Sequence, residues 1–505
     1  MIPRLATALL VATMLSSCGG RPAQETADDE LAAKIVPMLT ELIRFPTVQG
    51  NVEAREAQQQ WLLDTAKHLG FQARDTGKMV EIDLPAGEAA PVLGLVVHGD
   101  VQPANPEGWS FPPFEGTAKS GFVYGRGSCD DKGPLVQALL AMQSLKRSSR
   151  PRTHTVRLLV GSDEESDNTD VTEYLKAHRA PDLSLVLDYV FPVIVGEMAW
   201  TGLDLDTKPG PRGATDLPYQ VDSLTAGLSP SIVPDHATLT LKWSRGGVAN
   251  WAPVTSRFEA RTLPEGTRLK LAVSEDDPSV LIIDAFGKAA HGGVNLQGGR
   301  NALVALARAS EGLLPRSGED DLLAFARLAG KDNYGTGLGL TENDPIWGRY
   351  LVNVATVKPR GDGNLRLSIT FRRPPPRTAP QMKDFLTGKV RAFERATGAR
   401  FKVDGYWQSE PYVVDPESKL VKRLLASYER ATGEKARPGV AGGATYARRL
   451  PNAVAFGMWF PATPYAGHDV DERISIADLT RGTKVLIDAV TDIACGPPIE
   501  KPLEP

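Results

Sequence analysis

The chain has 505 residues, of which 42% are hydrophobic and 23% charged, and this is the composition of an ordinary globular protein. Its length exceeds what one hydrophobic core usually serves, so we expect two domains. The formal net charge of −4 and the lack of any Lys/Arg-rich tract argue against nucleic-acid binding.

The first twenty residues have the pattern of an export signal. A short segment with Arg4 precedes an apolar stretch, residues 5–15, that is too short to span a bilayer. The following Leu-Ser-Ser-Cys sequence resembles a bacterial lipobox, in which the cysteine, here Cys18, is lipidated and becomes the mature N-terminus. We therefore predict a signal peptide over 1–18, a flexible tether over 19–29, and membrane attachment through acyl chains only. The alternative is an ordinary signal peptide with an incidental cysteine.

The residue after this cysteine bears on the expected location. Gly19 gives no signal for retention in the inner membrane in the Gram-negative pattern. We therefore expect a lipid-anchored protein of the bacterial cell envelope that faces the periplasm, with the outer membrane favoured.

The remaining cysteines, Cys129 and Cys495, are too few for a disulfide framework in a chain this long.

After the tether, helical and strand-like segments alternate. Helical periodicity predicts a helix over 31–45, capped by Asp28 or Asp29, and a second over 52–69 that ends before Gly70. Short, wholly apolar runs follow, of the kind that is buried on both faces of a helix-covered α/β sheet. These runs are residues 92–97, 156–160 and 454–457, and a further helix is predicted over 133–146.

The sequence changes character at about residue 203. Alternating strands such as 237–243 and 365–371 are mixed with helices such as 300–313 and 380–397, which is typical of an antiparallel α+β domain. Long helices and a buried strand return later in the chain. The predicted organisation is an α/β domain over 30–202 and 408–497, interrupted by a second domain over 203–407 and followed by a tail over 498–505.

Polar side chains follow several of the buried strands. His98 and Asp100 follow the first strand, Glu164 and Glu165 follow the second, and Asp188 follows a later apolar run. In open α/β sheets ligands bind beyond the carboxyl ends of the strands. We therefore expect these side chains to gather at one site.

This group, with Asp130 and His468, offers two imidazoles and several carboxylates, a donor set that suits zinc. Two metal ions ~3.5–4 Å apart polarise a carbonyl and activate a water molecule. Glu164 could take the proton of that water, and Asp100 could orient the imidazole of His98. Each residue alone is a weak signal, because a Glu-Glu pair is usually a solvated loop and a late histidine is usually structural. The order of the residues along the chain carries the interpretation.

That order resembles one enzyme family. The chain is similar to the zinc-dependent amidohydrolases that include aminoacylase, glutamate carboxypeptidase and succinyl-diaminopimelate desuccinylase, and above all to dipeptidases of the peptidase V type. The resemblance extends from about Leu31 to Val490 and implies a phosphorylase/hydrolase-like α/β zinc-peptidase catalytic domain interrupted by an α+β lid domain. The matching segments are 98–103, 125–133, 162–166, 191–197 and 442–448, and His468 with Glu472.

The resemblance also implies how the metal ions are held. Two zinc ions would be bound per chain, and cobalt or manganese would suit the same ligands. The implied ligands are Asp130, which bridges both ions, His98 and Asp188 on one ion, and Glu165 and His468 on the other. Glu164 would be the general base and acid, and a cis peptide bond would follow Asp130.

The predicted lid carries further residues of the family pattern. Residues 287–293 resemble the lid motif, whose histidine, here His291, stabilises the oxyanion of the tetrahedral intermediate. Arg372 matches the position that holds the C-terminal carboxylate of the substrate, and Arg373 beside it is a rival. Gly443 would bring backbone close to the substrate. The alternatives are a surface-loop histidine and a plain glycine-rich turn.

These residues predict a di-zinc dipeptidase whose only partner is a small peptide with a free C-terminal carboxylate. A deacylase of N-acyl amino acids or carbamoyl compounds is one alternative, because Ser231 stands where the family usually has asparagine and an arginine suits any carboxylate. A non-catalytic lipoprotein that captures peptides is another. The enlarged lid predicts a monomer in which His291 serves the active site of its own chain.

Overall fold

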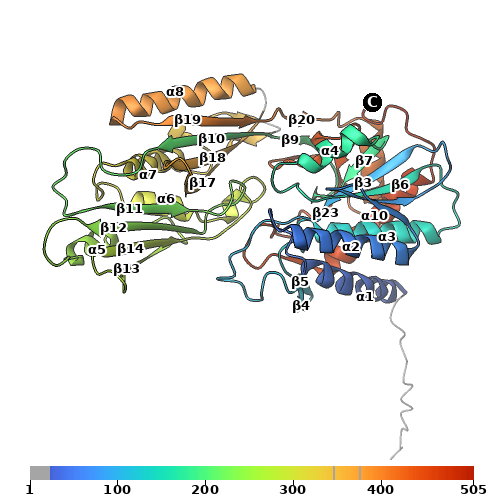
Figure 1. Cartoon of the computed structure of the whole chain (residues 1–505). Coiled ribbons are helices and arrows are strands. Elements are labelled where there is room, and N and C mark those ends of the chain that lie inside the picture. Colours follow the sequence, from blue (N-terminus) through green and yellow to red (C-terminus); the bar gives the residue numbers. More distant parts are fainter. Residues whose placement is uncertain (1–22, 345–346, 375–376, 505) are drawn as a thin grey trace, which may run out of the picture.

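The computed structural model describes residues 23–344, 347–374 and 377–504. They form two domains that lie side by side, the second inserted into the first (Figure 1). The first domain is built on a nine-stranded sheet and the inserted domain on an eight-stranded sheet. Over the described ranges, no helix is long and apolar enough to cross a membrane.

The first domain consists of a large sheet, its covering helices and two small strand pairings. The strands of the large sheet are β1 (Gln72–Asp75), β2 (Val80–Leu84), β3 (Val92–His98), β6 (Thr155–Gly161), β7 (Leu183–Val186), β9 (Ile194–Glu197), β20 (Tyr412–Val413), β21 (Gly439–Ala441) and β22 (Ala453–Ala455). The helices are α1 (Ala23–Ile43), α2 (Val52–Leu69), α3 (Lys132–Arg147), α4 (Thr169–Ala177), α9 (Lys419–Thr432), the short η3 (Tyr446–Arg448) and α10 (Ile476–Ala494). The smaller pairings join β4 (Thr117–Lys119), β5 (Phe122–Tyr124) and β24 (Arg473–Ser475), and β8 (Tyr189–Val190) with β23 (Met458–Trp459).

The centre of the large sheet is parallel and apolar on both faces. Strands β6, β3, β7 and β22 lie in this order and are parallel, whereas the outer pairs are mainly antiparallel. Leu93, Leu95 and Val97 of β3 pack into the main core, while Val96 packs on the opposite face with Val171 of α4. Helices on both faces therefore explain the unbroken apolar run, and the predicted α/β fold class is confirmed.

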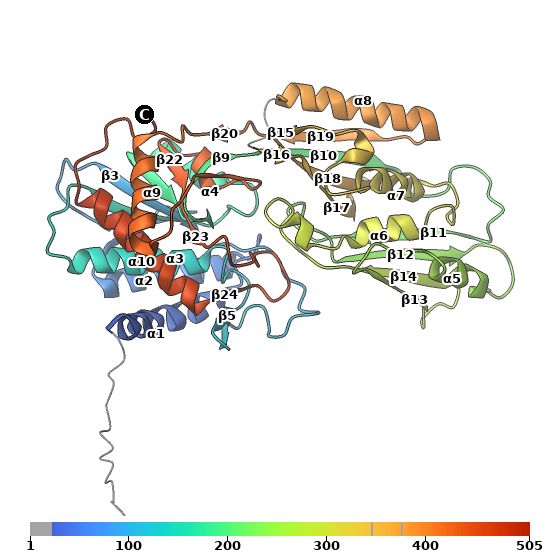
Figure 2. The same ribbon diagram turned by 180° about the vertical axis from the view of Figure 1, so that it is seen from behind.

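The last long helix belongs to the same core as the first ones. α10 packs against α9, as Figure 2 shows, and also against α1 and α3. Its buried residues face the core over its whole length, among them Leu479, Leu486 and Ile493. The two ends of the described chain therefore meet in the first domain.

The first helix begins earlier than the sequence pattern predicted. α1 begins at Ala23, so Asp28 and Asp29 lie inside the helix and the prediction that they cap it was wrong. The residues before them are mainly Ala, Gln and Glu, which favour helix, so part of the predicted tether is helical. The rest of the tether, residues 19–22, and the predicted lipidation site Cys18 lie outside the described residues.

The inserted domain is antiparallel, as the sequence predicted. Its sheet contains β10 (Ala199–Thr207), β11 (Tyr219–Ala226), β12 (His236–Trp243), β13 (Arg268–Val273), β14 (Val280–Phe286), β17 (Leu351–Pro359), β18 (Leu365–Arg373) and β19 (Lys402–Gln408). The helices are α5 (Ala252–Glu259), η1 (Leu296–Gly298), α6 (Ala302–Ala309), α7 (Gly318–Ala329), η2 (Thr336–Leu338) and α8 (Ala379–Thr397), and β15 (Asn343–Asp344) pairs with β16 (Gly348–Arg349).

The core of the inserted domain lies between its sheet and its helices. Alternate residues of β12 are fully buried there, namely Ala237, Leu239 and Leu241, and α8 contacts the edge strand β19 (Figure 1). α6 is shorter than the predicted helix over 300–313: Asn301 caps its start through the amide of Val304, and the helix ends at Ala309. α7 was not predicted separately.

Two neighbouring linkers connect the domains. The chain passes from β9 to β10 at Met198 and returns between β19 and β20. β10 pairs with β19 and β9 pairs with β20, so the outgoing and returning segments lie side by side. Beyond this connection, the loop after β14 reaches back to the first domain, where several of its residues contact the loop that precedes β24.

Candidate active site

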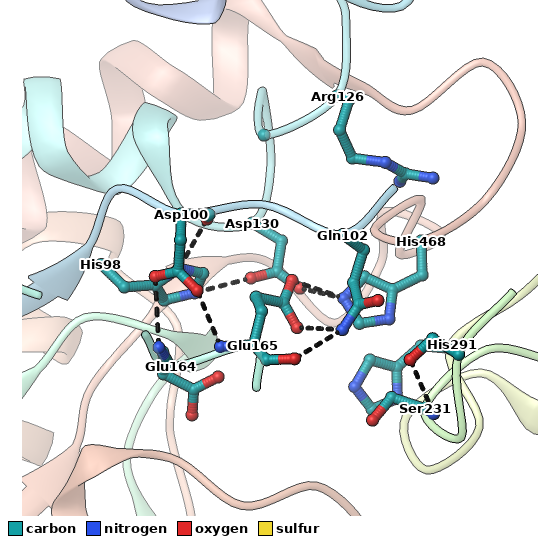
Figure 3. Close-up of polar contacts among 12 residues, drawn as sticks. His98, Asp100, Gln102, Arg126, Asp130, Glu164, Glu165, Ser231, His291 and His468 are labelled. Atoms are coloured by element: carbon teal, nitrogen blue, oxygen red, sulfur yellow. Dashed lines mark hydrogen bonds and ion pairs between the residues drawn. The ribbon is translucent and has the colours of Figure 1, made fainter. Parts of the chain in front are cut away.

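The predicted ligands converge at the carboxyl ends of the parallel strands (Figure 3). His98 is the last residue of β3, Glu165 lies in the loop after β6, and Asp188 follows β7. Asp130 lies just before α3, and His468 belongs to the loop before β24. Residues far apart in the sequence thus meet at the position where open α/β sheets bind ligands.

The candidate ligand atoms form two groups that share Asp130. In each group, these atoms lie within 4.8 Å of one another; the groups are His98, Asp130 and Asp188, and Asp130, Glu165 and His468. His98 Nε2 lies 3.0 Å from Asp130 Oδ1, whereas His468 Nε2 lies 3.2 Å from Asp130 Oδ2. His468 Nε2 is also 2.8 Å from Glu165 Oε1. Asp130 therefore turns one oxygen to each group, as a carboxylate that bridges two cations must.

The charges of the buried side chains at this site fit a pair of metal ions. Burial and the neighbouring Asp131 and Asp130 carboxylates raise the pKa of Asp188 well above its usual range. Although burial opposes a charge on His468, the adjacent Glu165 and Asp130 carboxylates raise its pKa to about 10. Asp188 thus lacks sufficient positive charge nearby. Imidazole and carboxylate donors at these separations suit zinc, and two cations would supply the missing charge.

The predicted general base lies beside these groups. Figure 3 shows the side chain of Glu164 next to Glu165, with its carboxylate pointing away from Asp100. Burial and the nearby Asp188 carboxylate raise the pKa of Glu164 well above its usual range. Glu164 therefore lies where its carboxyl group could exchange a proton beside the two ligand groups.

Asp100 holds the loop that carries the two glutamates. Its two carboxylate oxygens accept hydrogen bonds from the backbone amides of Glu164 and Glu165, at 3.2 and 3.0 Å. Nδ1 of His98 lies 2.9 Å from the backbone oxygen of Asp100 and 3.5 Å from the nearer carboxylate oxygen. The predicted contact with His98 is thus made mainly by the main chain, and the carboxylate serves the neighbouring loop.

Sequence reasoning assigned no role to several residues that support the ligands. Gln102 Nε2 donates to the backbone oxygen and to Oε2 of Glu165, at 2.9 and 3.1 Å. The hydroxyl of Tyr465 donates to Asp130 Oδ2 at 2.5 Å. Gln102 lies inside one of the segments that carry the family resemblance, so that motif could have identified it. No pattern in the sequence marks Tyr465.

Glu472 fixes the backbone that carries the shared aspartate. Its Oε1 accepts hydrogen bonds from the amides of Gly127, Cys129 and Asp130, at 3.0 to 3.2 Å. Its Oε2 pairs with Arg126 at 2.7 Å. The peptide bond after Asp130 is cis, as the family resemblance implied.

His291 reaches the site from the inserted domain. Its ring stacks on that of His468, with ring centroids 4.4 Å apart. Its Nδ1 accepts hydrogen bonds from the amides of Gly293 and Val294, both at 2.9 Å. The ring proton therefore lies on Nε2, which remains available as a donor. Burial, His468 and Arg372 hold the pKa of His291 well below its usual value, so the imidazole is neutral.

The loop that carries His291 is closely packed against the first domain. Lys288 Nζ lies 3.5 Å from Asp469 Oδ2. A Cβ atom on Gly442 would lie only 2.5 Å from the backbone oxygen of Gly293, so this contact requires glycine. Ser231 also lies here: its backbone oxygen accepts a hydrogen bond from the amide of Gly292 at 2.7 Å (Figure 3). The loop thus closes over the two candidate ligand groups of its own chain.

The two neighbouring arginines of β18 have different surroundings. Arg373 is committed to the structure, because it donates to the backbone oxygen of Ser409 at 2.9 Å and pairs with Glu410 at 3.1 Å. Both arginines are buried and the Nε of each lacks a hydrogen-bond partner in the described part of the chain, but of the two only Arg373 has a carboxylate as ion-pair partner there. Burial and the nearby Arg448 lower the pKa of Arg372 to about 10. Arg372 is therefore the arginine of the two that can receive an anion.

Gly443 lies close to the same region. A Cβ atom there would be 3.2 Å from Val294 Cγ2 and 3.3 Å from Tyr189 Cε2. The hydroxyl of Tyr189 accepts a hydrogen bond from the amide of Gly442 at 3.2 Å. A side chain at Gly443 would thus crowd the space between the lid loop and the first domain.

The sequence matches one family over most of its length. The model of "Peptidase family M20/M25/M40" matches residues 94–492. A protein of Bacillus subtilis (strain 168), "Putative dipeptidase YtjP", is 29% identical over 434 residues, which cover 86% of this chain and 89% of the relative. A "Putative dipeptidase" of Staphylococcus epidermidis is 27% identical, over 85% of this chain and 88% of the relative.

Solved structures share the fold at lower sequence identity. Human carnosine dipeptidase 1 aligns with a TM-score of 0.58 and 12% identity, over 92% of this chain and 96% of that chain. The dipeptidase Dug1p of Saccharomyces cerevisiae aligns with a TM-score of 0.57 and 13% identity over the same shares. The arrangement of two domains is therefore that of known dipeptidase structures.

Proposed function

The chain belongs to the peptidase family M20/M25/M40, which makes it a metallopeptidase, and we propose that it is a di-zinc dipeptidase. Its substrates are short peptides with a free C-terminal carboxylate. The observation that carries the proposal is the pair of ligand groups that share Asp130, with Glu164 beside them. The relatives named as dipeptidases support the substrate class.

In this proposal Glu164 and His291 act on a substrate that lies beside the two ligand groups. The five ligand side chains would hold two zinc ions, which would supply Lewis-acid polarisation of a carbonyl and activation of water. Glu164 accepts a proton from the attacking water and delivers it to the leaving amine. The Nε2–H of His291 donates to the oxygen on which negative charge develops, and such a donor typically lowers a barrier by about 3–4 kcal/mol.

Arg372 determines the length of the substrate by binding its C-terminal end. Its guanidinium binds the C-terminal carboxylate through two parallel hydrogen bonds, which suit its planar fork. A buried arginine with an unused donor gains a counter-charge when this carboxylate arrives. In this proposal, binding of the C-terminal carboxylate at Arg372 selects peptides with one residue after the scissile bond.

The proposal is tested on the purified chain by metal analysis combined with hydrolysis assays. We expect two zinc ions per chain, hydrolysis of free dipeptides, loss of activity with a chelator, and recovery with zinc. Glu164→Gln should retain the metal ions and lose about 10²–10⁴-fold in kcat, because the proton acceptor is removed. Glu173→Gln, at an exposed position of α4, is the control.

Substrate variants separate the dipeptidase from its alternatives. Amidation of the C-terminus should abolish hydrolysis, because Arg372 then has no carboxylate to bind. A preference for the N-acetylated form of a dipeptide would indicate a deacylase instead. Peptide binding without hydrolysis, or full activity of Glu164→Gln, would contradict the proposed mechanism.

We further propose that the chain acts as a monomer attached to the bacterial envelope through acyl chains on Cys18. The lipobox-like sequence supports the attachment, and the position of His291 in the site of its own chain supports the monomer. Incorporation of labelled fatty acid should be seen in the wild type and lost in Cys18→Ser. An unlabelled wild-type protein would remove the anchor, and with it the expected location facing the periplasm.

A further inference from the structure

The hydroxyl of Tyr465 contacts the carboxylate that both ligand groups share. It lies 2.5 Å from Asp130 Oδ2, the same oxygen that faces His468 Nε2 at 3.2 Å. A phenol has one proton to donate, and each carboxylate oxygen offers about two acceptor sites. Oδ2 can therefore accept the proton of Tyr465 with one site and face a cation with the other.

The surroundings of Tyr465 hold the hydroxyl in this position. Its ring packs against Trp459, with ring centroids 4.5 Å apart, and lies edge-on to His291 at 6.2 Å. Its backbone oxygen accepts a hydrogen bond from Asn295 of the lid loop at 3.4 Å. A Cβ atom on Gly467 would lie 2.1 Å from the hydroxyl. The phenol therefore fills the space that a side chain at position 467 would need.

The other contacts of the Asp130 carboxylate do not fix its orientation independently of metal ions. Within the described ranges, the side chains that contact it besides Tyr465 are His98 and His468, which are themselves candidate ligands. Of Asp130, Glu472 contacts the backbone amide and not the carboxylate. The carboxylate can therefore rotate about its last side-chain bond unless Tyr465 restrains it.

We propose that Tyr465 is a positioning residue that holds Asp130 with one oxygen toward each metal ion. This inference rests on the proposed metal-dependent function. Without the hydroxyl, Oδ2 is no longer directed at Glu165 and His468, so the ion bound there loses a well-oriented ligand. Loss of a partner that orients a ligand typically costs about 10–100-fold in metal affinity or activity.

The test is a comparison of zinc affinities in the absence of substrate. Tyr465→Phe removes the hydroxyl and keeps the ring that packs against Trp459. Competition with a chromophoric chelator should show zinc bound about 10–100-fold more weakly, with the greatest loss at the ion that Oδ2 faces. Tyr412→Phe is the matched control, because it removes a hydroxyl that bonds to the backbone oxygen of Ala453, away from the ligand groups.

A kinetic measurement at saturating zinc gives a second readout. Tyr465→Phe should lower kcat for a dipeptide with little change in KM, because Arg372 is untouched. If Tyr465→Phe binds both zinc ions as tightly as the wild type does, the inference is overturned, even if the wild-type enzyme is active. A wild type that binds no zinc would instead refute the proposed function, so the two failures are distinct.

A purely structural role of the hydroxyl gives a different result. It would lower the melting temperature of the metal-free protein and leave both zinc affinities unchanged, which also overturns the inference. If Tyr465→Phe does not fold, Gly467→Ala displaces the same hydroxyl. It should show the same loss of zinc affinity, and wild-type affinities there would contradict the proposal.

Discussion

At the scale of single residues, the adjacent Arg372 and Arg373 have different roles because their side chains have different neighbours. Both are buried with an unpaired Nε in the described structure, but Arg373 is bonded to Ser409 and Glu410, while Arg372 has no carboxylate as ion-pair partner there. A strand turns successive side chains to opposite faces, which explains why neighbours in sequence meet different partners. The family resemblance favoured Arg372 and left Arg373 as a rival, and the contacts of Arg373 add a structural reason for that preference.

This difference predicts the effect of conservative substitutions. Arg372→Lys should raise KM for dipeptides by about 10–100-fold with a smaller change in kcat, since lysine cannot make two parallel hydrogen bonds to a carboxylate. Steady-state kinetics on a dipeptide and its C-terminal amide measure this. Arg373→Lys is the control and should change thermal stability more than KM. An unchanged KM in Arg372→Lys would remove this residue from substrate binding.

The convergence of the candidate metal ligands could be predicted from the sequence because each stands at the end of an apolar run or inside a motif. His98, Glu165 and Asp188 follow buried strands, and the fold must bring such strand ends together. Asp100 was placed near the site, but its main hydrogen bonds were not foreseen. Tyr465 was missed, because its role depends on the path of a loop, and no residue spacing encodes that path.

At the scale of single elements, α7 begins with three carboxylates in succession, Glu319, Asp320 and Asp321. Burial and the adjacent Asp321 raise the pKa of Asp320 to about 6. A raised pKa means that the folded state binds the proton more tightly than the unfolded state. Ionisation of Asp320 therefore lowers stability as pH rises from about 4 to about 6, and the loss is constant above this range.

Asp320→Asn should remove this loss. The melting temperature should exceed that of the wild type by about 2–4 °C above pH 7, which corresponds to about 1 kcal/mol in a domain of this size once solvent exposure is allowed for. The gain should shrink as the pH approaches 4. Asp384→Asn, at an exposed position of α8, is the control. A gain that does not vary with pH would show that charge is not its cause.

The boundaries of elements were predictable where a local signal ends them. α2 runs from Val52 to Leu69, as predicted, because Gly70 adopts the left-handed conformation with a φ of 72°. α1 and α6 were predicted less well. Both lack a decisive local signal at one end, and packing against other elements decides their length.

At the scale of the whole molecule, the lid places His291 in the metal site of its own chain. The proposed monomer therefore has a complete active site. Light scattering of the purified chain, without its first 22 residues, should give the mass of one chain at every concentration that supports activity. A tight dimer that loses activity on dilution would contradict this, and a His291→Ala variant rescued by mixing with Glu164→Gln would do so directly.

The contacts of α10 have a consequence for the timing of biosynthesis. This helix packs against α1, α3 and α9, and His468 precedes it by only a few residues. The inserted domain lies within one continuous stretch and can form while synthesis is still under way, whereas the surrounding domain stays incomplete until the ribosome has nearly finished. In a polypeptide with the predicted export signal, no hydrolytic centre can therefore assemble until the last helix has been synthesised.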